Sequence, residues 1–309
     1  QACPPIRDNY KTYNRNNMKR TVIYTLLLFS LAPLFYGCSE DDPGGKSIFE
    51  PSEVKRTEFD LWLLDNYVNA YNIDMKYRME DVISDMTFNL VPASLENSIK
   101  ISKLIKHLWL EVYDEVAGVD FMRTYVPKVI HLIGSPAIDA EAQTEVLGTA
   151  EGGLMVTLYK VNELNTENID SLNYFYFKTM HHEFAHILHQ TKNYPKDFEK
   201  ITTSDYSPTG WMNRTEKEAW KMGFVSKYAS SEPQEDFVEI IAIYLTSNNE
   251  AWQEILKGAG TDGSEIIQKK FGIVRNWLKN SWNINIDDLR KVVERRSSEI
   301  GNIDYDLDE

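Results

Sequence analysis

The 309-residue sequence is poor in cysteine and in positive charge, and it contains no internal repeat or low-complexity block. Its two cysteines, Cys3 and Cys38, are too few for a disulfide framework. The formal net charge of −14 argues against a nucleic-acid partner, because phosphate binding requires a basic surface. The apolar run over residues 21–34 is shorter than the roughly 20 residues that a membrane span needs. A hydrophobic content of 42% is nevertheless ample for one large domain or two small ones.

The same apolar run predicts an export signal. It follows a positively charged start and ends at a glycine followed by Cys38, which resembles a bacterial lipobox. We therefore expect upstream residues and a lipoprotein signal peptide over 1–37, with Met18 as the start. A lipidated Cys38 and a flexible acidic tether would then occupy residues 38–50. An ordinary signal peptide with an accidental cysteine is the alternative. Lipidation would leave no free thiol for chemistry.

A histidine cluster indicates a metal site. Four of the six histidines lie between residues 181 and 189, and His182 to His186 forms a His-Glu-x-x-His motif. Residues four apart lie on one face of a helix, so both imidazoles can point at one ion. Glu183 can then reach a water bound to that ion, which is the zinc-peptidase interpretation of the motif. The alternative is a core helix with several histidines, although unpaired imidazoles in an apolar helix are costly.

A catalytic zinc ion takes a third protein ligand and leaves one position for water. The metzincin pattern is excluded, because it requires glycine and histidine where this chain has His189 and Lys192. The other arrangement takes a carboxylate from a later helix, and the helix expected over residues 234–246 carries Glu235 and Glu239 on one face. One can coordinate zinc while the other accepts the free N–H of a ligand histidine. We favour Glu235 as the ligand.

The other polar residues near the motif have structural alternatives. Glu235 and Glu239 could form structural ion pairs, or Asp236 could take one of their roles. His189 lies too far along the helix to share a tetrahedral ion comfortably with both motif histidines. We expect His189 either to hydrogen-bond to a ligand histidine or to pack in the core. The remaining histidines, His181, His107 and His131, are expected to be structural.

The rest of the pattern predicts an α+β fold, with strands early and helices late. Helices are expected over residues 57–68, 94–116, 170–191, 234–246, 252–256, 266–278 and 286–300, and after the capping box that Thr215 opens. Strands are expected over 126–133 and 154–161, and around 77–79. The strand over 154–161 could be the sheet edge that binds a peptide, or an internal strand. The helical lobe would span residues 192–300, followed by a disordered acidic tail over 301–309.

The chain resembles the gluzincins, in particular the zinc metallopeptidase lipoproteins of Bacteroidetes encoded beside TonB-dependent import systems. The resemblance rests on the lipoprotein start and the segments HHEFAHILHQ and KYASSEPQEDFVEIIAIYL. It implies a zincin-like domain over residues 51–309, with an upper lobe over 51–191, a small mixed sheet and one zinc ion. It also implies Glu235 as the third ligand, Glu239 as the supporting acid and Tyr228 as the oxyanion stabiliser. A loop tyrosine packed on the core is the alternative at position 228.

These features predict zinc-dependent hydrolysis of a peptide or protein substrate, with Glu183 as general base. The acidic run after Cys38 resembles the signal that carries some Bacteroidetes lipoproteins to the cell surface. We therefore expect an outer-membrane lipoprotein, held only by its lipid anchor and tied to nutrient import with TonB-dependent partners. The main alternative is a non-catalytic zinc-binding accessory lipoprotein, against which the intact Glu183 argues. Hydrolysis of a non-peptide amide is a weaker third hypothesis.

Overall fold

The structure is a computed structural model that describes residues 55–307, apart from residues 81, 86, 140–143, 147 and 152–153. The chain divides into two compact units, Gln1–Lys55 and Arg56–Glu309, and every element named below belongs to the second. The predicted signal peptide, Cys38 and the tether lie outside the described residues. Among the helices that are described, none combines the length and the apolar character that crossing a membrane requires.

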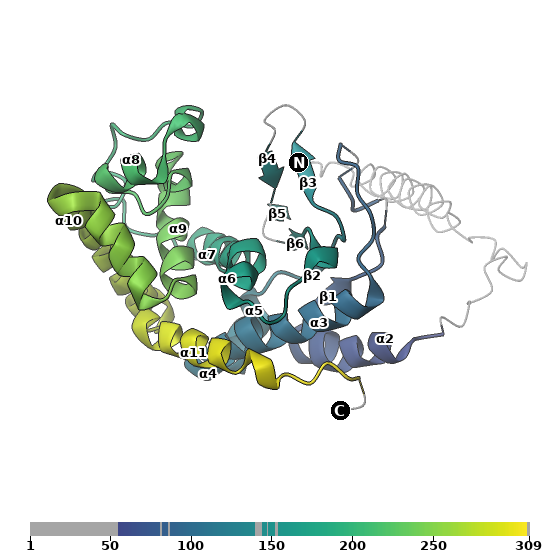
Figure 1. The fold of residues 1–309 in the computed structure, drawn as a ribbon. Coiled ribbons are helices and arrows are strands. Elements are labelled where there is room, and N and C mark those ends of the chain that lie inside the picture. Colours follow the sequence, from purple (N-terminus) through teal and green to yellow (C-terminus); the bar gives the residue numbers. More distant parts are fainter. Residues whose placement is uncertain are drawn as a thin grey trace, which may run out of the picture. The chain divides into compact units, whose positions relative to one another are not determined.

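A small mixed sheet forms part of this second unit (Figure 1). Its strands, in spatial order, are β1 (Asp74–Lys76), β2 (Val129–Leu132), β6 (Met155–Leu158) and β5 (Gly148–Glu151). The first three are parallel, and β5 runs antiparallel to β6. All four residues of β6 are buried, which explains the continuous apolar run in its sequence. A separate antiparallel pair joins β3 (Ala137–Asp139) to β4 (Thr144–Val146).

The sheet confirms two predicted strands and corrects their roles. Strands lie inside both 126–133 and 154–161. The second does not form the sheet edge, because it pairs with β2 on one side and β5 on the other. The internal alternative is therefore confirmed for β6. The sequence Gly-Thr-Ala-Glu of β5 has little β-propensity, so only its pairing with β6 reveals it. The strand expected around residues 77–79 lies instead at 74–76, as β1.

Helices make up most of the remaining chain. In chain order they are α2 (Glu58–Leu63), α3 (Leu95–Ile105), α4 (Glu111–Ala117), α5 (Val119–Tyr125), α6 (Ile169–Leu172), α7 (Lys178–Thr191), α8 (Glu216–Lys221), α9 (Pro233–Thr246), α10 (Asn249–Trp282) and α11 (Ile286–Ser298). Three of the predicted helices contain π-helical turns, at Leu64–Asn69, Lys106–Leu110 and Asn173–Phe177. The predicted capping box of Thr215 and Glu218 is present at the start of α8.

The C-terminal region matches one prediction and departs from another. The helices expected over 252–256 and 266–278 lie within α10 on either side of a kink at Gly260, whose φ of +70° is not helical. The tail was expected to be disordered from residue 301, but the described chain continues to Leu307. Ile303, Tyr305 and Leu307 pack against the main core, because their apolar side chains alternate with the acidic residues between them.

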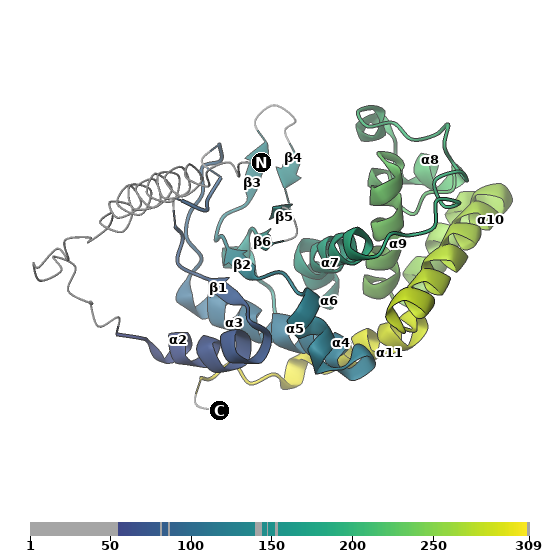
Figure 2. The same cartoon turned by 180° about the vertical axis from the view of Figure 1, so that it is seen from behind.

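Helices α7 and α9 lie against each other at the centre of the unit (Figures 1 and 2). Ten consecutive residues of α9, from Asp236 to Leu245, are buried, as expected for a helix with neighbours on all sides. Helix α7 buries Phe184, Ala185 and Leu188 in the same core. Polar side chains on the facing surfaces of these two helices therefore have little access to water and must find partners in each other. The α+β fold with a helical C-terminal region agrees with the sequence prediction.

Candidate metal centre

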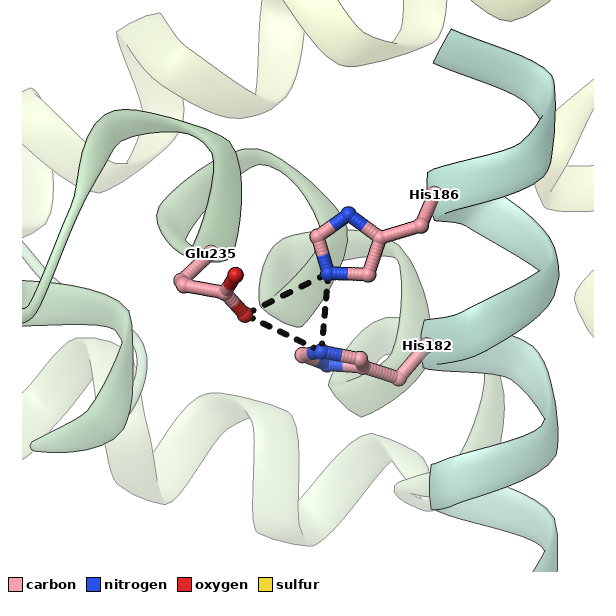
Figure 3. Close-up of side chains that lie close together, drawn as sticks. All are labelled: His182, His186 and Glu235. Atoms are coloured by element: carbon pink, nitrogen blue, oxygen red, sulfur yellow. Dashed lines mark hydrogen bonds and ion pairs between the residues drawn. The ribbon is translucent and has the colours of Figure 1, made fainter. Parts of the chain in front are cut away.

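Three donor atoms from α7 and α9 converge on one point (Figure 3). The Nε2 atoms of His182 and His186 are 3.2 Å apart, and both face Oε2 of Glu235, at 3.1 Å and 3.3 Å. The histidines are one helical turn apart on α7, so they share a face, and Glu235 reaches them from the first turn of α9. Within the described residues, this is the one group of histidine and acidic side chains with metal-site spacing.

The donor set fits a tetrahedral zinc ion. Zinc binds imidazole nitrogen and carboxylate oxygen at about 2.0–2.2 Å, which places the ligand atoms of a tetrahedron about 3.3–3.6 Å from one another. Of the three observed separations, 3.3 Å lies at the lower limit of that range, and 3.1 Å and 3.2 Å lie about 0.1–0.2 Å below it. Two imidazoles and one carboxylate also match the protein ligands of a catalytic site, in which the fourth position is left for water or substrate. His182, His186 and Glu235 would therefore hold the ion.

A carboxylate network supports His182. Nδ1 of His182 donates to Oε1 of Glu239 at 2.9 Å. The other oxygen of Glu239 accepts from the Ser226 hydroxyl at 2.6 Å and pairs with Nζ of Lys178 at 2.9 Å. Burial alone would raise the pKa of Glu239, but Lys178 and His182 outweigh it and lower that pKa to about 2. Glu239 is therefore a charged acceptor that fixes the tautomer and the orientation of the His182 ring.

His186 has a different support. Its Nδ1 lies 2.9 Å from Nε2 of His189, whose ring packs against Tyr194 with ring centroids 5.5 Å apart. Burial and the neighbouring His186 lower the pKa of His189 to about 4. His189 is therefore a neutral imidazole at physiological pH and accepts the His186 N–H through its lone pair. Helix α7 thus supplies both a proposed ligand and the side chain behind it.

The electrostatics of the cluster favour a positive charge at its centre. Burial opposes protonation of His182, but Glu235 and Glu239 outweigh burial and raise the pKa of His182 to about 9. Burial would raise the pKa of Glu235, but His182 and His186 outweigh burial and lower that pKa below its ordinary value. Two carboxylates are thus held ionised around two imidazoles. A divalent cation held by His182, His186 and Glu235 would neutralise this negative charge without protonation of the histidines.

Glu183 and Tyr228 both lie beside this cluster. Glu183 is partly buried, and burial raises the pKa of its carboxyl, while the charges of His182 and His186 act to lower it. The ring of Tyr228 lies 5.9 Å from the ring of His182, and burial followed by Glu235 raises the pKa of its hydroxyl. The predicted base and the predicted oxyanion donor are therefore gathered around the same centre, next to the three donor atoms.

Asp236 is directed elsewhere, although it follows Glu235 in the sequence. Its Oδ2 lies 2.6 Å from Nζ of Lys270 and accepts from the Tyr206 hydroxyl at 2.8 Å, and both members of the ion pair are fully buried. The alternative in which Asp236 takes a metal-site role is therefore wrong. The reason is helical geometry, because adjacent residues on a helix point about 100° apart.

The remaining histidines occupy structural positions, as the sequence predicted. Nδ1 of His181 lies 3.0 Å from the Tyr113 hydroxyl, in the core, and Nε2 of His107 lies 3.0 Å from the carbonyl oxygen of Arg296. His131 is fully buried on β2. None of the three contributes to the metal cluster within the described residues.

Two residues of the centre escaped sequence analysis, Lys178 and Ser226. Lys178 carries a recognisable signal, because it stands one helical turn before His182 and so shares the face that meets α9. Ser226 carries none. It reaches Glu239 only because the segment before Tyr228 folds back over α9, where the Ser226 hydroxyl also accepts the backbone N–H of Ala229 at 3.0 Å.

The fold and the donor set define a zinc-binding centre of the kind found in zinc hydrolases. The family described as "Putative zinc-binding metallo-peptidase" matches residues 52–287, and the chain belongs to this family of zinc-binding metallopeptidases. It is similar to a solved crystal structure, that of a "putative zinc-binding metallo-peptidase from Bacteroides caccae". The two share 53% sequence identity over 84% of this chain and 99% of that chain, with a TM-score of 0.74. Comparison with curated proteins returns no match. The predicted membership of a zinc metallopeptidase family and the predicted zinc cofactor are thereby confirmed.

Proposed function

We propose that this protein is a gluzincin-like zinc peptidase that hydrolyses peptide bonds. The observation that carries this proposal is the convergence of His182, His186 and Glu235 at 3.1–3.3 Å with Glu183 beside them. A purely structural zinc site has no need of an acid next to its ligands in the position of a general base. Membership in a zinc-binding metallopeptidase family supports the same conclusion.

The proposed mechanism assigns one role to each side chain around the centre. Zinc held by His182, His186 and Glu235 would polarise the scissile carbonyl and acidify a water molecule. Glu183 removes a proton from the attacking water and then delivers it to the leaving amine. The Tyr228 hydroxyl donates a hydrogen bond to the developing oxyanion, where negative charge increases most during the attack.

The first experiment compares two neighbouring substitutions. Glu183→Gln keeps the three proposed ligands, so we expect one zinc ion per chain and a loss of turnover of roughly 10²–10⁴-fold, the usual contribution of a general base. His182→Ala removes a ligand, so we expect the purified protein to contain almost no zinc. Zinc content is measured by atomic emission and turnover by mass spectrometry of a mixed peptide library. Full activity of Glu183→Gln would contradict the mechanism.

The same library addresses the non-catalytic alternative. If the wild-type protein binds one zinc ion and cleaves no peptide in the library, a zinc-binding accessory lipoprotein becomes the better description. Cleavage that depends on both zinc and Glu183 excludes that alternative. The hydrolysis of a non-peptide amide would require a separate assay. It would appear as zinc-dependent turnover of N-acylated amines without any cleavage of the peptide library.

We further propose that the protein is an outer-membrane lipoprotein at the cell surface, anchored through Cys38 and associated with TonB-dependent import. The support for this is the sequence of the leader and the acidic tether that follows Cys38. Metabolic labelling with a fatty-acid analogue should mark the wild-type protein and not Cys38→Ala. Equal labelling of the two, or labelling of neither, would exclude the lipid anchor. Co-purification from membranes is the test of an import partner.

A further inference from the structure

A row of aromatic rings leads outward from the proposed zinc ligands. The ring centroids of His182 and Tyr228 are 5.9 Å apart, and those of Tyr228 and Trp211 are 5.0 Å apart with the planes at 74°. Trp211 lies in the 3₁₀ turn Gly210–Asn213 and is half-buried, and the next residue, Met212, is 54% exposed. Trp211 is therefore connected to the proposed ligand His182 through one intervening ring, that of Tyr228, and it lies next to an exposed apolar side chain. We call Trp211 and Met212 the apolar patch.

The segment that carries the apolar patch is held in place by hydrogen bonds. The backbone N–H of Ser207 donates to the carbonyl of Ser230 at 2.9 Å, which ties the segment to the turn after Tyr228. The N–H of Gly210 donates to the Ser207 hydroxyl at 3.1 Å. A Cβ at Gly210 would lie 2.3 Å from the same hydroxyl oxygen, so a larger residue there would displace the hydroxyl that caps the turn. The orientation of Trp211 is thus set before any substrate arrives, which reduces the entropy lost on binding.

Packing in the core does not account for the apolar patch. The half-buried aromatic residues nearby, such as Tyr206 and Trp220, pack against the main core, whereas Trp211 and Met212 do not belong to that set. The contacts of the Trp211 ring are instead with Tyr228 and with the Lys227 ammonium, 5.8 Å from the ring centroid. A preorganised indole with a free apolar surface, beside a reactive centre, is a typical feature of a site that recognises a ligand.

We propose that the apolar patch determines substrate specificity by contacting a large apolar side chain of the peptide next to the scissile bond. This inference rests on the proposed peptidase function. Consecutive Cα atoms of a peptide are about 3.8 Å apart, so a residue that flanks the scissile bond lies within reach of rings this close to the ligands. The substrate class is therefore peptides with Phe, Tyr, Trp, Leu or Met beside the cleaved bond, because such side chains bury the most apolar surface against an indole.

The test compares cleavage preferences of wild-type, Trp211→Ala and Trp211→Phe proteins, all loaded with zinc. The probe is a mixture of blocked decapeptides of random sequence, with cleavage sites read by mass spectrometry. We expect the wild type to enrich large apolar residues at one position beside the cleaved bond. In Trp211→Ala that enrichment should fall by about 10-fold, the size of effect that differences between apolar side chains in a pocket produce. Trp211→Phe should retain most of it. Leu61→Ala, which shortens an exposed apolar side chain of α2, is the control and should behave as wild type.

A second arm separates this inference from the proposed function. Zinc-loaded Glu183→Gln, with and without Trp211→Ala, is immobilised, and the peptides that it retains from the same mixture are sequenced. Retention of large apolar residues only when Trp211 is present supports the inference, even if the wild type cleaves nothing and the proposed function fails. An unchanged preference in Trp211→Ala overturns the inference. So does an equal loss for every peptide, because that result would mean that Trp211 only positions Tyr228.

Discussion

The two histidines of the metal centre are supported in opposite ways. On the carboxylate side, His182 donates to Glu239, which is held by Lys178 of α7 and by Ser226 of the segment before α9. On the imidazole side, His186 donates to His189, a residue of the same helix. A hydrogen bond to a charged acceptor is roughly twice as strong as one to a neutral acceptor. As proposed ligands, the two histidines therefore present the same Nε2 atom to the centre but differ in basicity and in how firmly they are held.

This difference has a structural origin. The carboxylate side spans two helices, so it forms only when α7 and α9 are packed together, and it links metal binding to the tertiary fold. The imidazole side forms within one helix, because His186 and His189 are three residues apart and meet on one face. We infer that the carboxylate side orients the site and that the imidazole side adds a smaller, local contribution. The predictions below test that order.

The largest effect is expected on the carboxylate side. Glu239→Gln keeps the size of the side chain but removes the charge that His182 and Lys178 both contact. Loss of a carboxylate behind a ligand histidine usually weakens metal binding by about 10–100-fold. Zinc affinity is measured by competition with a chromophoric chelator, with circular dichroism as the check on folding.

Glu115→Gln is the matched control for this substitution. Glu115 on α4 also pairs with two cationic side chains, Arg295 and Arg296, but it is not part of the metal cluster. We expect its zinc affinity to equal that of the wild type. If Glu239→Gln and Glu115→Gln bound zinc equally well, the carboxylate side would have no special role in orienting His182.

A smaller effect is expected on the imidazole side. His189→Phe keeps an aromatic ring against Tyr194 but removes the acceptor for Nδ1 of His186. A hydrogen bond between neutral groups contributes about 0.5–1.5 kcal/mol, so zinc affinity should fall by about 2- to 10-fold. The same chelator competition measures it, and His107→Gln serves as the control. A loss that equals or exceeds that of Glu239→Gln would reverse the proposed order of the two sides.

The sequence predicted the facing residues of this centre better than the network behind them. Helical periodicity brings His182 and His186 onto one face of α7, and the same rule brings Glu235 and Glu239 onto one face of α9. The side chains behind the ligands are different. Ser226 depends on how a loop folds back over α9, and no local pattern in the sequence specifies that path. Periodicity predicts which side chains share one face of a helix. It does not predict which side chains of another segment will contact that face.

The same limit explains the errors in the fold. The internal strand over 155–158 was recognised from its own apolar residues, but its neighbour β5 has no such pattern and is defined by pairing alone. The two C-terminal helices were expected to be separate, and α10 does divide at Gly260, whose φ of +70° is not helical. Two further glycines beside this kink are required by packing. A Cβ at Gly258 would lie 2.5 Å from the Trp220 ring, and one at Gly263 would lie 2.4 Å from the Trp220 carbonyl oxygen.

The smallest effect is expected at His131, an imidazole that has neither a carboxylate nor another imidazole as a hydrogen-bond partner. His131 is fully buried, and neither of its ring nitrogens has a hydrogen-bond partner. Burial lowers the pKa of His131, with a weaker lowering by Lys76 and an opposing effect of Glu80. Because the folded-state pKa lies below that of the unfolded chain, its neutral form stabilises the fold above about pH 6.5, and this stability is lost as the pH falls below that value.

His131→Gln should therefore reduce the acid sensitivity of the fold. The free energy of unfolding, measured in urea between pH 5 and pH 7 with zinc removed by a chelator, should fall less steeply with decreasing pH than in the wild type. The difference between the two slopes is limited to about 1.4 kcal/mol per pH unit, the contribution of one proton. His181, whose pKa burial lowers to about 3, contributes with the same sign in both proteins and cancels in the comparison. Parallel pH profiles would mean that the pKa of His131 is the same in the folded and unfolded states, and that result would contradict this prediction.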